Sequence, residues 1–449
     1  MTQSPYRISR FNIFSVDPRD GCAVVFNGVT GQLSRLNPRT KMALSSSGRL
    51  ALLKPEERNE FRQLGMLVPD FRDELEHLKQ RYQRIASAAA DAIFVISPCS
   101  ACNLRCPYCY QQAMTPQTAV MDEATAARTV RFIRREMATT ARQKAIIKFY
   151  GGEPLMALKR CRAIAEAADR EIQQELGKAI FIWFQSNGTL IDERTFADPI
   201  PGMGCVEMTL DGPQHRHDKT RVGRRGRPTF RRICEAARIL ADREIPVILR
   251  INCENPKELG EALEDLTHYR LDQLPGLSLY DGRVGDCFDD MTSGNFAGAA
   301  AVAEEHKAME SSLQTRRLVA GTHWQEKFQR YPLFSRFTGI CTFARRDAWC
   351  IDPQGDLYEC IFQVGVPEFK VGTIGSDGRA RYRANYETIM NRDPFDNAQC
   401  RQCACLPLCW GGCFAKAYKQ KGSWDAKFCG SIPELAAQNI AMGLAGGDL

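Results

Sequence analysis

Cysteines constrain this chain more than any other feature of its sequence. The chain has 449 residues and 19 cysteines, which gather in two places: four lie within residues 99–109, and nine lie within residues 341–429. An odd number of cysteines fits unpaired thiolates better than a disulfide framework. The sequence opens on Met1-Thr-Gln-Ser-Pro-Tyr-Arg, without the apolar stretch of a signal peptide. We therefore expect a cytoplasmic protein whose two groups of cysteines do metal or redox work.

Composition places the chain among globular proteins of more than one domain. Hydrophobic residues make up 44% of the sequence and charged residues 25%, which excludes a disordered or collagen-like chain. No uncharged run approaches the roughly 18 residues that a membrane span needs. The scattered cysteines lie in apolar or helical contexts, and we expect them to be small buried hydrophobes. These are Cys22, Cys161, Cys205, Cys234, Cys253 and Cys287.

Residues 1–75 are predicted to form a small α+β domain. Two strand-like segments, 6–15 and 22–26, precede two helical patterns, around 41–53 and 55–64. This order is similar to that of the winged-helix-like domains that recognise leader peptides in peptide-modifying enzymes. An N-terminal cap that only packs on the rest of the protein would show the same pattern.

A linker helix is predicted at residues 76–90, and beyond it, over residues 91–325, short apolar runs alternate with helical patterns. One of these helices follows Asp122, a good N-cap residue. Six strand–helix units in series predict parallel strands covered by helices, in a barrel or a doubly wound sheet. The predicted strands cover residues 93–96, 145–150, 180–184, 206–210, 247–251 and 277–280.

Polar residues follow each of these predicted strands. Both architectures place their chemistry at the carboxyl ends of the strands, so we expect these residues to converge on one rim. The cysteine loop follows the first strand. The later strand ends are Tyr150-Gly151-Gly152-Glu153-Pro154, Gln185-Ser186-Asn187-Gly188, Thr209-Leu210-Asp211-Gly212, Arg250-Ile251-Asn252 and Tyr280-Asp281.

The cysteine loop has the spacing of a cluster site. Cys102, Cys106 and Cys109 follow the pattern C-x3-C-x2-C. Three thiolates from one loop can hold three irons of a [4Fe–4S] cluster and leave the fourth iron open. A zinc site is disfavoured because zinc prefers four protein ligands and no histidine or second cysteine pair lies nearby. Cys99 is disfavoured as a fourth ligand because it still belongs to the end of the preceding strand.

With Tyr108 before the last cysteine, the loop reads C-x3-C-x-aromatic-C and resembles that of radical S-adenosylmethionine (SAM) enzymes. The resemblance implies a partial (β/α)6 TIM-like barrel. It also implies that the open iron chelates SAM and that reductive cleavage yields a 5′-deoxyadenosyl radical, which removes hydrogen from the substrate.

Further motifs carry the same resemblance. Gly151-Gly152-Glu153-Pro154 is similar to the family's GGEP, which meets the methionine ammonium. Ser186-Asn187-Gly188-Thr189 stands where many members have T-N-G-T. Thr209 and Asp211 take the positions of ribose contacts, and Arg250 is placed to pair with the SAM carboxylate. The implied SAM-binding residues are Tyr108, Gly151, Gly152, Glu153, Pro154, Ser186, Asn187, Thr209, Asp211 and Arg250.

The C-terminal cysteines resemble those of the SPASM domain, which holds auxiliary iron–sulfur clusters, and residues 326–430 are predicted to form one. The resemblance assigns Cys341, Cys360 and Cys413 to one auxiliary [4Fe–4S] cluster, whose fourth position is either open or filled by Cys350. It assigns the other auxiliary cluster to Cys400, Cys403, Cys409 and Cys429. C-x2-C spacing also suits a zinc ribbon.

Cys405 has no assigned role in the cysteine-rich segment. A final helix is predicted at residues 431–449.

The resemblance favours an enzyme that modifies a ribosomally made precursor peptide, by forming a thioether or carbon–carbon crosslink. Sulfatase-maturating members, which make formylglycine, carry an aspartate where this chain has Ile361, so that activity is the alternative. The basic stretch 219–232 could bind RNA, but no RNA-binding motif accompanies it. The expected partners are a precursor peptide, through its leader, and a flavodoxin- or ferredoxin-type electron donor, with no membrane and no nucleic acid.

Overall fold

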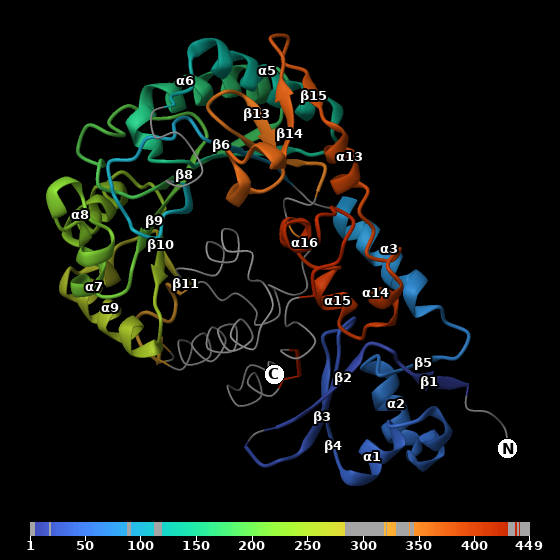
Figure 1. Ribbon diagram of the computed structural model, residues 1–449. Coiled ribbons are helices and arrows are strands. Elements are labelled where there is room, and N and C mark those ends of the chain that lie inside the picture. Colours follow the sequence, from blue (N-terminus) through green and yellow to red (C-terminus); the bar gives the residue numbers. More distant parts are fainter. Residues whose placement is uncertain are drawn as a thin grey trace.

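The computed structural model describes residues 5–17, 19–87, 91–111, 119–282, 318–319, 321–328, 341, 345–429, 436–437 and 440. Figure 1 shows an N-terminal region, a large curved sheet covered by helices, and a C-terminal region that lies between the two. Cys287 lies outside the described residues, as does most of the helix predicted at 431–449. None of the described helices combines the length and apolar character that crossing a membrane requires.

The N-terminal region has the α+β composition that the sequence predicts. A three-stranded antiparallel sheet packs with two helices, and a further antiparallel pair lies beside it. The sheet contains β2 (Asn12–Val16), β3 (Ala23–Asn27) and β4 (Leu33–Leu36), and the pair contains β1 (Tyr6–Ile8) and β5 (Leu67–Pro69). The helices are α1 (Pro38–Ala43) and α2 (Pro55–Gln63).

Two N-terminal elements differ from their predictions. The segment 6–15 is not one strand, because β1 pairs with β5 whereas β2 pairs with β3. The helical pattern at 41–53 is also divided: α1 ends at Ala43 and a 3₁₀ helix covers Ser47–Leu52. The break coincides with residues 45–48, three serines and a glycine, which are poorer helix formers than the residues around them.

The long helix α3 (Glu74–Ser87) follows the N-terminal region in the chain and packs against the C-terminal region. Its Leu78 packs with Phe395 and Trp410 in a cluster of buried side chains. A second cluster joins β3 to the cysteine-rich segment, because Phe26 packs with Cys405. Cys405, which had no assigned role, is therefore a core residue of this contact.

In the described part of the chain, ten strands form the main sheet, in the order β11-β10-β9-β8-β7-β6-β12-β13-β14-β15. Strands β6 to β11 are all parallel, as predicted, and β12 adds to β6 in parallel before three antiparallel strands complete the sheet. The parallel strands are β6 (Asp91–Ile96), β7 (Lys144–Phe149), β8 (Ala179–Ser186), β9 (Met203–Leu210), β10 (Val247–Asn252) and β11 (Leu277–Gly282). The others are β12 (Ala348–Ile351), β13 (Asp356–Tyr358), β14 (Lys370–Ile374) and β15 (Ala380–Tyr382).

Helices cover one face of this sheet (Figure 1). They include α5 (Glu123–Thr139), α6 (Leu158–Ala168), α7 (Gln214–Thr220), α8 (Phe230–Ala241) and α9 (Pro256–His268). The C-terminal region adds α13 (Ala384–Met390), α14 (Ala398–Gln402), α15 (Leu406–Cys409) and α16 (Phe414–Lys421). Asp122 caps α5 as predicted, since its side chain accepts a hydrogen bond from the Thr125 N–H.

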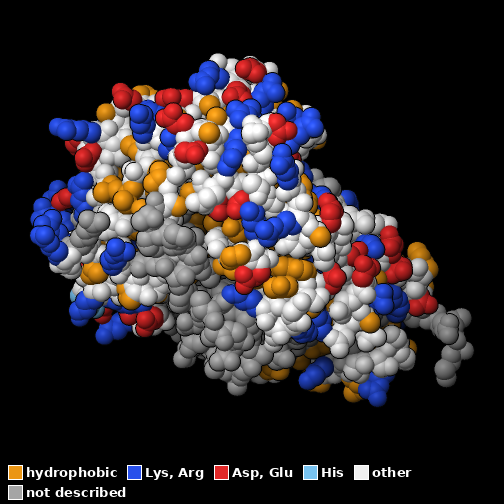
Figure 2. Space-filling view, turned by 45° about the horizontal axis from the view of Figure 1, so that its top comes forward, with side chains coloured by type: hydrophobic (Ala, Val, Ile, Leu, Met, Phe, Trp, Pro, Cys, Tyr) orange, Lys and Arg blue, Asp and Glu red, His pale blue; other side chains and the backbone are white. Residues whose placement is uncertain are grey.

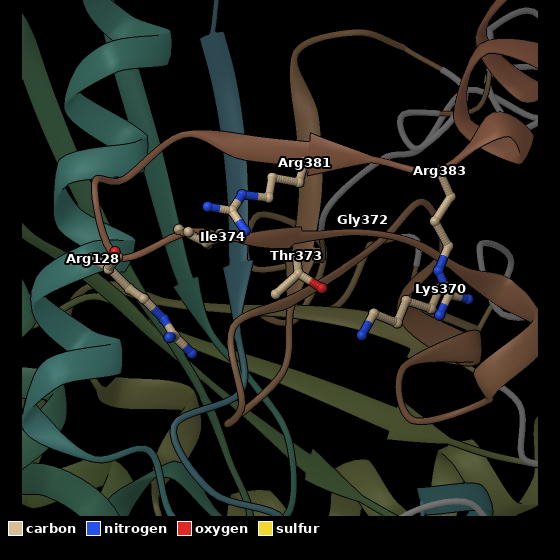
Figure 3. A pocket seen from close by; sticks show the side chains of 9 residues that line it. Arg128, Lys370, Gly372, Thr373, Ile374, Arg381 and Arg383 are labelled. Atoms are coloured by element: carbon tan, nitrogen blue, oxygen red, sulfur yellow. The ribbon is translucent and has the colours of Figure 1, made fainter.

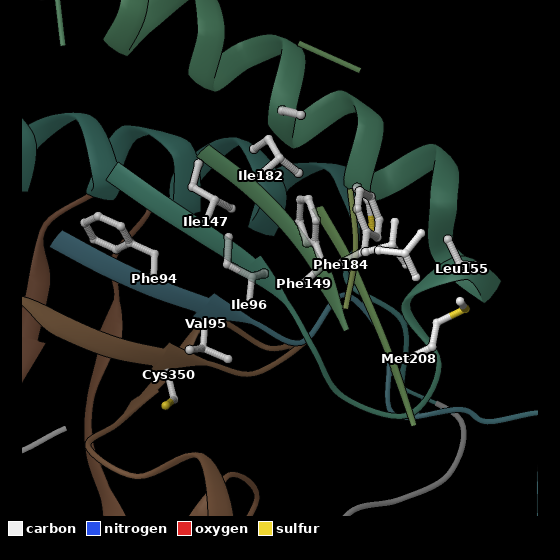
Figure 4. Close-up of a cluster of buried hydrophobic side chains, with 14 of the residues drawn as sticks. Phe94, Val95, Ile96, Ile147, Phe149, Leu155, Ile182, Phe184, Met208 and Cys350 are labelled. Carbon is white, nitrogen blue, oxygen red and sulfur yellow. The ribbon is translucent and has the colours of Figure 1, made fainter. Parts of the chain in front are cut away.

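The two faces of the sheet carry different side chains. Figure 4 shows Phe94, Ile96 and Ile147 directed toward the helices, whereas Val95 and Cys350 point to the opposite face. Alternation along a strand requires this, since successive side chains point to opposite sides. The fold class predicted from the sequence, an α/β partial barrel, is therefore confirmed, and its inner face is available for chemistry.

Candidate active site at the cysteine loop

The cysteine loop follows β6 and is fixed at several points. Cys99 forms a β-bridge with Val120, and Leu104 forms one with Gly223. The Arg105 N–H also donates to the Val222 carbonyl at 3.2 Å. The loop is thus held between its own return path and the segment that follows α7.

Hydrogen bonds are directed at the first thiol of the loop. The Cys102 Sγ accepts from the Leu104 N–H at 3.4 Å and from the Asn187 side-chain amide at 3.8 Å. Burial raises the pKa of the Cys102 thiol to about 11. Burial also raises the pKa of Cys106, and Arg221 opposes this by favouring the thiolate. Donors aimed at sulfur and a nearby cation are the means by which proteins stabilise cluster-bound thiolates.

The donor set of the loop fits an iron–sulfur cluster better than a single metal ion. Among the described residues, no three histidine, cysteine or acidic side chains are placed around one ion. A [4Fe–4S] cluster binds each cysteine through a different iron, so its ligands must face a common space rather than a common point. Cys102, Cys106 and Cys109 all lie in this one loop, and the latter two act electrostatically on Cys102.

Cys99 has a different environment from these three cysteines. Its side chain is fully buried, and its thiol donates to the Glu153 carbonyl at 3.2 Å. Burial raises its pKa to about 11. The thiol of Cys99 is therefore already engaged in joining the cysteine loop to the turn after β7.

Gly151 and Gly152 allow that turn to lie directly against the cysteine loop. A Cβ on Gly152 would stand 2.1 Å from the Ala101 carbonyl oxygen, and a Cβ on Gly151 would stand 2.3 Å from the Ser97 hydroxyl. Gly151 also has a φ of +136°, which other residues rarely adopt. The close approach permits a hydrogen bond from the Glu153 N–H to the Ala101 carbonyl at 2.8 Å. Pro154 then begins a 3₁₀ helix, Pro154–Ala157.

Glu153 joins the ends of two strands. Its carboxylate is fully buried and accepts from the Ser186 hydroxyl at 2.8 Å and from the Asn187 N–H at 2.7 Å. A third bond, 3.0 Å long, comes from the Leu155 N–H. The Asn187 amide in turn donates to the Asn103 side chain at 2.8 Å. The residues predicted from two separate motifs thus form one network with the cysteine loop.

Asp211 connects the cysteine loop to the end of β9. Its buried carboxylate accepts from the Tyr108 hydroxyl at 2.5 Å, the Thr220 hydroxyl at 2.9 Å and the Asn252 amide at 2.9 Å. The Arg221 guanidinium donates to the same Tyr108 hydroxyl at 2.8 Å. Burial alone would raise the pKa of Asp211, but Arg221 and the bond from Tyr108 bring it below its ordinary value.

Sequence reasoning missed Arg221, which lies in the basic stretch 219–232. The Nε of Arg221 is buried and has no hydrogen-bond partner among the described residues. Its guanidinium donates to the Tyr108 hydroxyl, so this arginine of the basic stretch contacts the cysteine loop. The signal available in the sequence was only its nearness to Asp211, which does not reveal a contact with Tyr108.

Comparison with known proteins agrees with this geometry. Residues 96–266 match the family model of the Radical SAM superfamily. These residues form a radical SAM domain. The match begins at the last residue of β6 and includes the cysteine loop, the glycine turn and the ends of β7 to β10. The protein is accordingly an enzyme that uses SAM and a [4Fe–4S] cluster, as the motifs predict.

Curated relatives of the radical SAM enzyme are distant. The chain is 23% identical over 349 residues to the serine-type anaerobic sulfatase-maturating enzyme of Bacteroides thetaiotaomicron, covering 70% of this chain and 80% of that protein. It is 20% identical over 340 residues to the cysteine-type enzyme of Clostridium perfringens strain 13, covering 71% and 88%.

Solved structures share the fold with this radical SAM enzyme. The anSMEcpe structure with bound AdoMet aligns with a TM-score of 0.58 and 17% identity, over 79% of this chain and 97% of that one. The structure of Streptococcus suis SuiB bound to S-adenosylmethionine aligns with a TM-score of 0.50 and 15% identity, over 95% of this chain and 98% of that one.

A buried histidine contacts the backbone of Asp211 in the radical SAM site. His217 is fully buried, its Nδ1 accepts from the Asp211 N–H at 3.1 Å, and its Nε2 lies 3.0 Å from the Thr229 hydroxyl. Burial, with Arg221 adding repulsion, lowers the pKa of His217 from 6.5 to about 3. The ring is therefore neutral in the folded enzyme at neutral pH.

We expect His217 to make the stability of the enzyme depend on pH. Its pKa is depressed on folding, so its contribution is present above the unfolded value of 6.5 and is lost as pH falls toward about 3. The free energy of unfolding should drop by roughly 1 kcal/mol between pH 7 and about pH 5.5 because of this group. Urea titrations at several pH values in that range measure the slope of the free energy of unfolding against pH. The His217→Asn variant should show a smaller slope, and an unchanged slope would assign the effect to other groups.

The inner face of the barrel carries charges that sequence reasoning also missed. The Lys148 ammonium of β7 lies 3.1 Å from the Glu207 carboxylate of β9, which also accepts from the Tyr280 hydroxyl at 2.6 Å. Lys148 stands 4.2 Å from the ring centre of Trp183. Ile147 packs in the core against the helices, so Lys148 points to the opposite, inner face. The sequence did contain a signal for Lys148 and Glu207, because each is a charged residue within an otherwise apolar predicted strand.

Two predicted SAM contacts lie on the same inner face. Arg250 is the register partner of Thr209 on one side and of Tyr280 on the other. A Cβ on Gly282 would stand 2.4 Å from the Arg250 Nε, so the absence of a side chain there leaves room for the guanidinium. The structure thus brings Arg250 and Thr209 together near the carboxyl ends of their strands.

The C-terminal cysteines fall into two spatial groups. Burial raises the pKa of Cys350, and the nearby Cys360 and Cys341 raise it further. In the second group, burial raises the pKa of Cys409 to about 11, and Cys403, Cys400 and Cys429 add to this. A side-chain hydrogen bond from Cys405 lowers the pKa of Cys403 to about 6.

Cys413 lies near the second group, because it acts on Arg392 together with Cys400 and Cys409. The Arg392 guanidinium holds this loop by donating to the Gly412 and Ala426 carbonyls, both at 3.0 Å. The two groups match the predicted pairing except at Cys413, which was assigned with Cys341 and Cys360 but lies near Cys400 and Cys409. The assignment of ligands to the two clusters stays a prediction.

Proposed function

We propose that this radical SAM enzyme modifies a ribosomally made precursor peptide by forming a thioether or carbon–carbon crosslink. The observation that carries the proposal is the extent of the fold. Similarity to SuiB covers 95% of this chain, which takes in most of the N-terminal region, whereas similarity to anSMEcpe covers 79%. The N-terminal sheet packs on the cysteine-rich segment through Phe26 and Cys405, so a bound leader would be held at a fixed position.

In the proposed mechanism, Cys102, Cys106 and Cys109 hold the catalytic cluster. When bound, the cluster and SAM would supply the chemistry for hydrogen-atom abstraction from an unactivated carbon. The turn Gly151–Pro154, Ser186, Asn187, Thr209 and Arg250 would orient SAM at the rim. Asp211 would contribute at the same rim and would also position Tyr108, whose hydroxyl donates to its carboxylate.

The inner charges suit the polar part of a peptide. A buried ion pair contributes little to stability, because desolvation offsets most of the attraction between its charges. Lys148 and Glu207 are therefore better explained as groups that face a substrate than as structural ones. The ammonium retains donors for a backbone carbonyl, and the carboxylate can receive an N–H.

We further propose that the C-terminal cysteines hold two auxiliary clusters. One would use Cys400, Cys403, Cys409 and Cys429. The other would use Cys341, Cys360 and Cys413, with Cys350 as the fourth ligand or with one iron open. The nearness of Cys350 to Cys341 and Cys360 supports its recruitment.

Formylglycine formation is the second candidate, since the curated relatives are sulfatase-maturating enzymes. The position after Cys360 is Ile361, which cannot act as a base. The preceding residue does not replace it, because Glu359 is only 2% exposed and burial raises its pKa well above the ordinary value. The crosslink is therefore favoured.

Peptide incubation tests the proposal. The enzyme, anaerobically reconstituted and supplied with SAM and dithionite, should convert a peptide encoded by a neighbouring short reading frame to a product lighter by two hydrogen atoms. Tandem mass spectrometry should show fragments missing between the linked residues. A product that reacts with a hydrazide probe would contain an aldehyde and would replace the crosslink by formylglycine. Modification of RNA with no peptide product would overturn the assignment.

A further inference from the structure

A basic pocket lies at the far end of the main sheet. It has a volume of about 490 Å³ and is formed by the β14–β15 hairpin and α5. Figure 3 shows four basic side chains around it: Arg128 from the helix, Lys370 from β14, and Arg381 and Arg383 from β15 and its end.

Most of the positive charge in this pocket is not neutralised by the protein. Lys370 forms an ion pair with Asp356 at 2.7 Å. Within the described residues, no carboxylate lies within 4.0 Å of the guanidiniums of Arg128, Arg381 or Arg383. Figure 2 shows acidic and basic side chains interspersed over the upper part of one face of the molecule. An unneutralised group of arginines at a concave site favours an anionic ligand, because guanidiniums bind carboxylates through paired hydrogen bonds.

The same pocket lies beside an open strand edge. Among the described strands, β15 is the last of the sheet and pairs only with β14. The Arg383 N–H donates to the Val371 carbonyl at 2.7 Å, and the Gly375 N–H donates to the Arg379 carbonyl at 2.8 Å. Along an antiparallel strand, residues whose backbone groups bond to the neighbouring strand alternate with residues whose backbone groups point the other way. The N–H and carbonyl groups of Ala380 and Tyr382 therefore point away from β14. An extended chain can pair with such an edge.

We propose that an extended acidic segment of the peptide substrate binds here, with its backbone along β15 and its carboxylates on Arg381 and Arg383. Arginines 381 and 383 are spaced by the period of a strand, so acidic residues at alternate positions of a paired chain match them. This inference rests on the proposed function for the identity of the peptide as substrate. Arg128 and Lys370 would hold a further carboxylate within the pocket.

Edge charges have another known use, which is to prevent sheets from joining edge to edge. That use requires neither a pocket nor an arginine from α5, yet Arg128 lines the pocket and donates to the Gln354 carbonyl in the turn between β12 and β13. Its Nε is buried and has no partner among the described residues. A protective role predicts aggregation when the charges are removed and no specific binding when they are present.

Fluorescence anisotropy tests the proposal without SAM or reductant, so its outcome is independent of the proposed chemistry. The probe is a labelled octapeptide with glutamate at alternate positions, and the control probe has glutamine there. The full-length enzyme should bind the acidic probe, and added salt should weaken binding. Arg381→Gln with Arg383→Gln should lower affinity by at least about tenfold. Arg231→Gln, an exposed arginine on α8, should leave it unchanged.

A second variant separates backbone pairing from charge. Ala380→Pro removes an N–H that faces away from β14, which an edge strand tolerates. It should weaken binding of the acidic probe while the arginines stay in place. The proposal would be overturned if the enzyme bound the two probes equally. It would also be overturned if the Arg381→Gln/Arg383→Gln variant bound the acidic probe as tightly as the unsubstituted enzyme does. Tighter binding of an oligo-dT strand than of the acidic probe, or displacement of the probe by millimolar inorganic phosphate alone, would overturn it as well.

Discussion

Replacing Cys106 with alanine is expected to abolish the release of 5′-deoxyadenosine from SAM. The catalytic cluster needs three thiolates from the cysteine loop, and the thiol of the neighbouring Cys99 is already bonded to the Glu153 carbonyl. Cys102→Ala and Cys109→Ala should behave alike. Liquid chromatography of reactions driven by dithionite measures the product, which should fall to background. The iron content of each reconstituted variant should fall by about four atoms per chain.

Cys99→Ser is the matched control for these variants. A serine hydroxyl is close in shape to the thiol and can also donate to the Glu153 carbonyl, so the turn after β7 should keep its position. The variant is expected to retain SAM cleavage and iron. Loss of both in Cys99→Ser, with retention in Cys106→Ala, would mean that Cys99 and not Cys106 is a cluster ligand.

The parallel half of the sheet was predictable because each of its strands is marked by an apolar run within its own short segment. The apolar runs at 145–150 and 247–251 became β7 and β10 within about one or two residues. Strands of this kind are buried on a face covered by helices, so composition alone marks them. The cap of α5 at Asp122 was predictable for the same reason, since Asp122 and the Thr125 N–H that donates to it are neighbours in sequence.

The ends of the sheet were not predictable in this way. β12 pairs with β6, although more than 250 residues separate Ala348 from Ile93. The division of the segment 6–15 into two strands also depends on a distant partner, β5. Pairing over such distances depends on tertiary packing, which a pattern along one segment does not contain.

The candidate site was predictable as a set of strand ends, but not in its connections. The motifs named Glu153 and Asp211 as SAM contacts, and that assignment stays a prediction. The structure adds that both carboxylates are buried and accept several hydrogen bonds from the protein. It also adds Arg221 and His217, which no motif named. Each acts through a contact that only folding creates.

Asp211 is the residue on which these contacts depend most. Tyr108, Thr220 and Asn252 all donate to its carboxylate, and the cationic Arg221 lies beside it. Removing one member of a buried charged network leaves the other charge without compensation, which is costlier than removing both. Three donors would also be left unsatisfied or would have to find water.

We expect Asp211→Ala to destabilise the enzyme by about 3–5 kcal/mol. A loss of this size should lower the midpoint of thermal unfolding by on the order of 10 °C. Differential scanning fluorimetry on the protein without cluster measures it. Glu193→Ala removes an ion pair to Arg243 in which the glutamate is 76% exposed, so it should shift the midpoint by no more than about 2 °C. Asp211→Asn, which keeps the shape but not the charge, should fall between the two. Equal midpoints for Asp211→Ala and Glu193→Ala would show that Tyr108 and Arg221 hold the cysteine loop without Asp211.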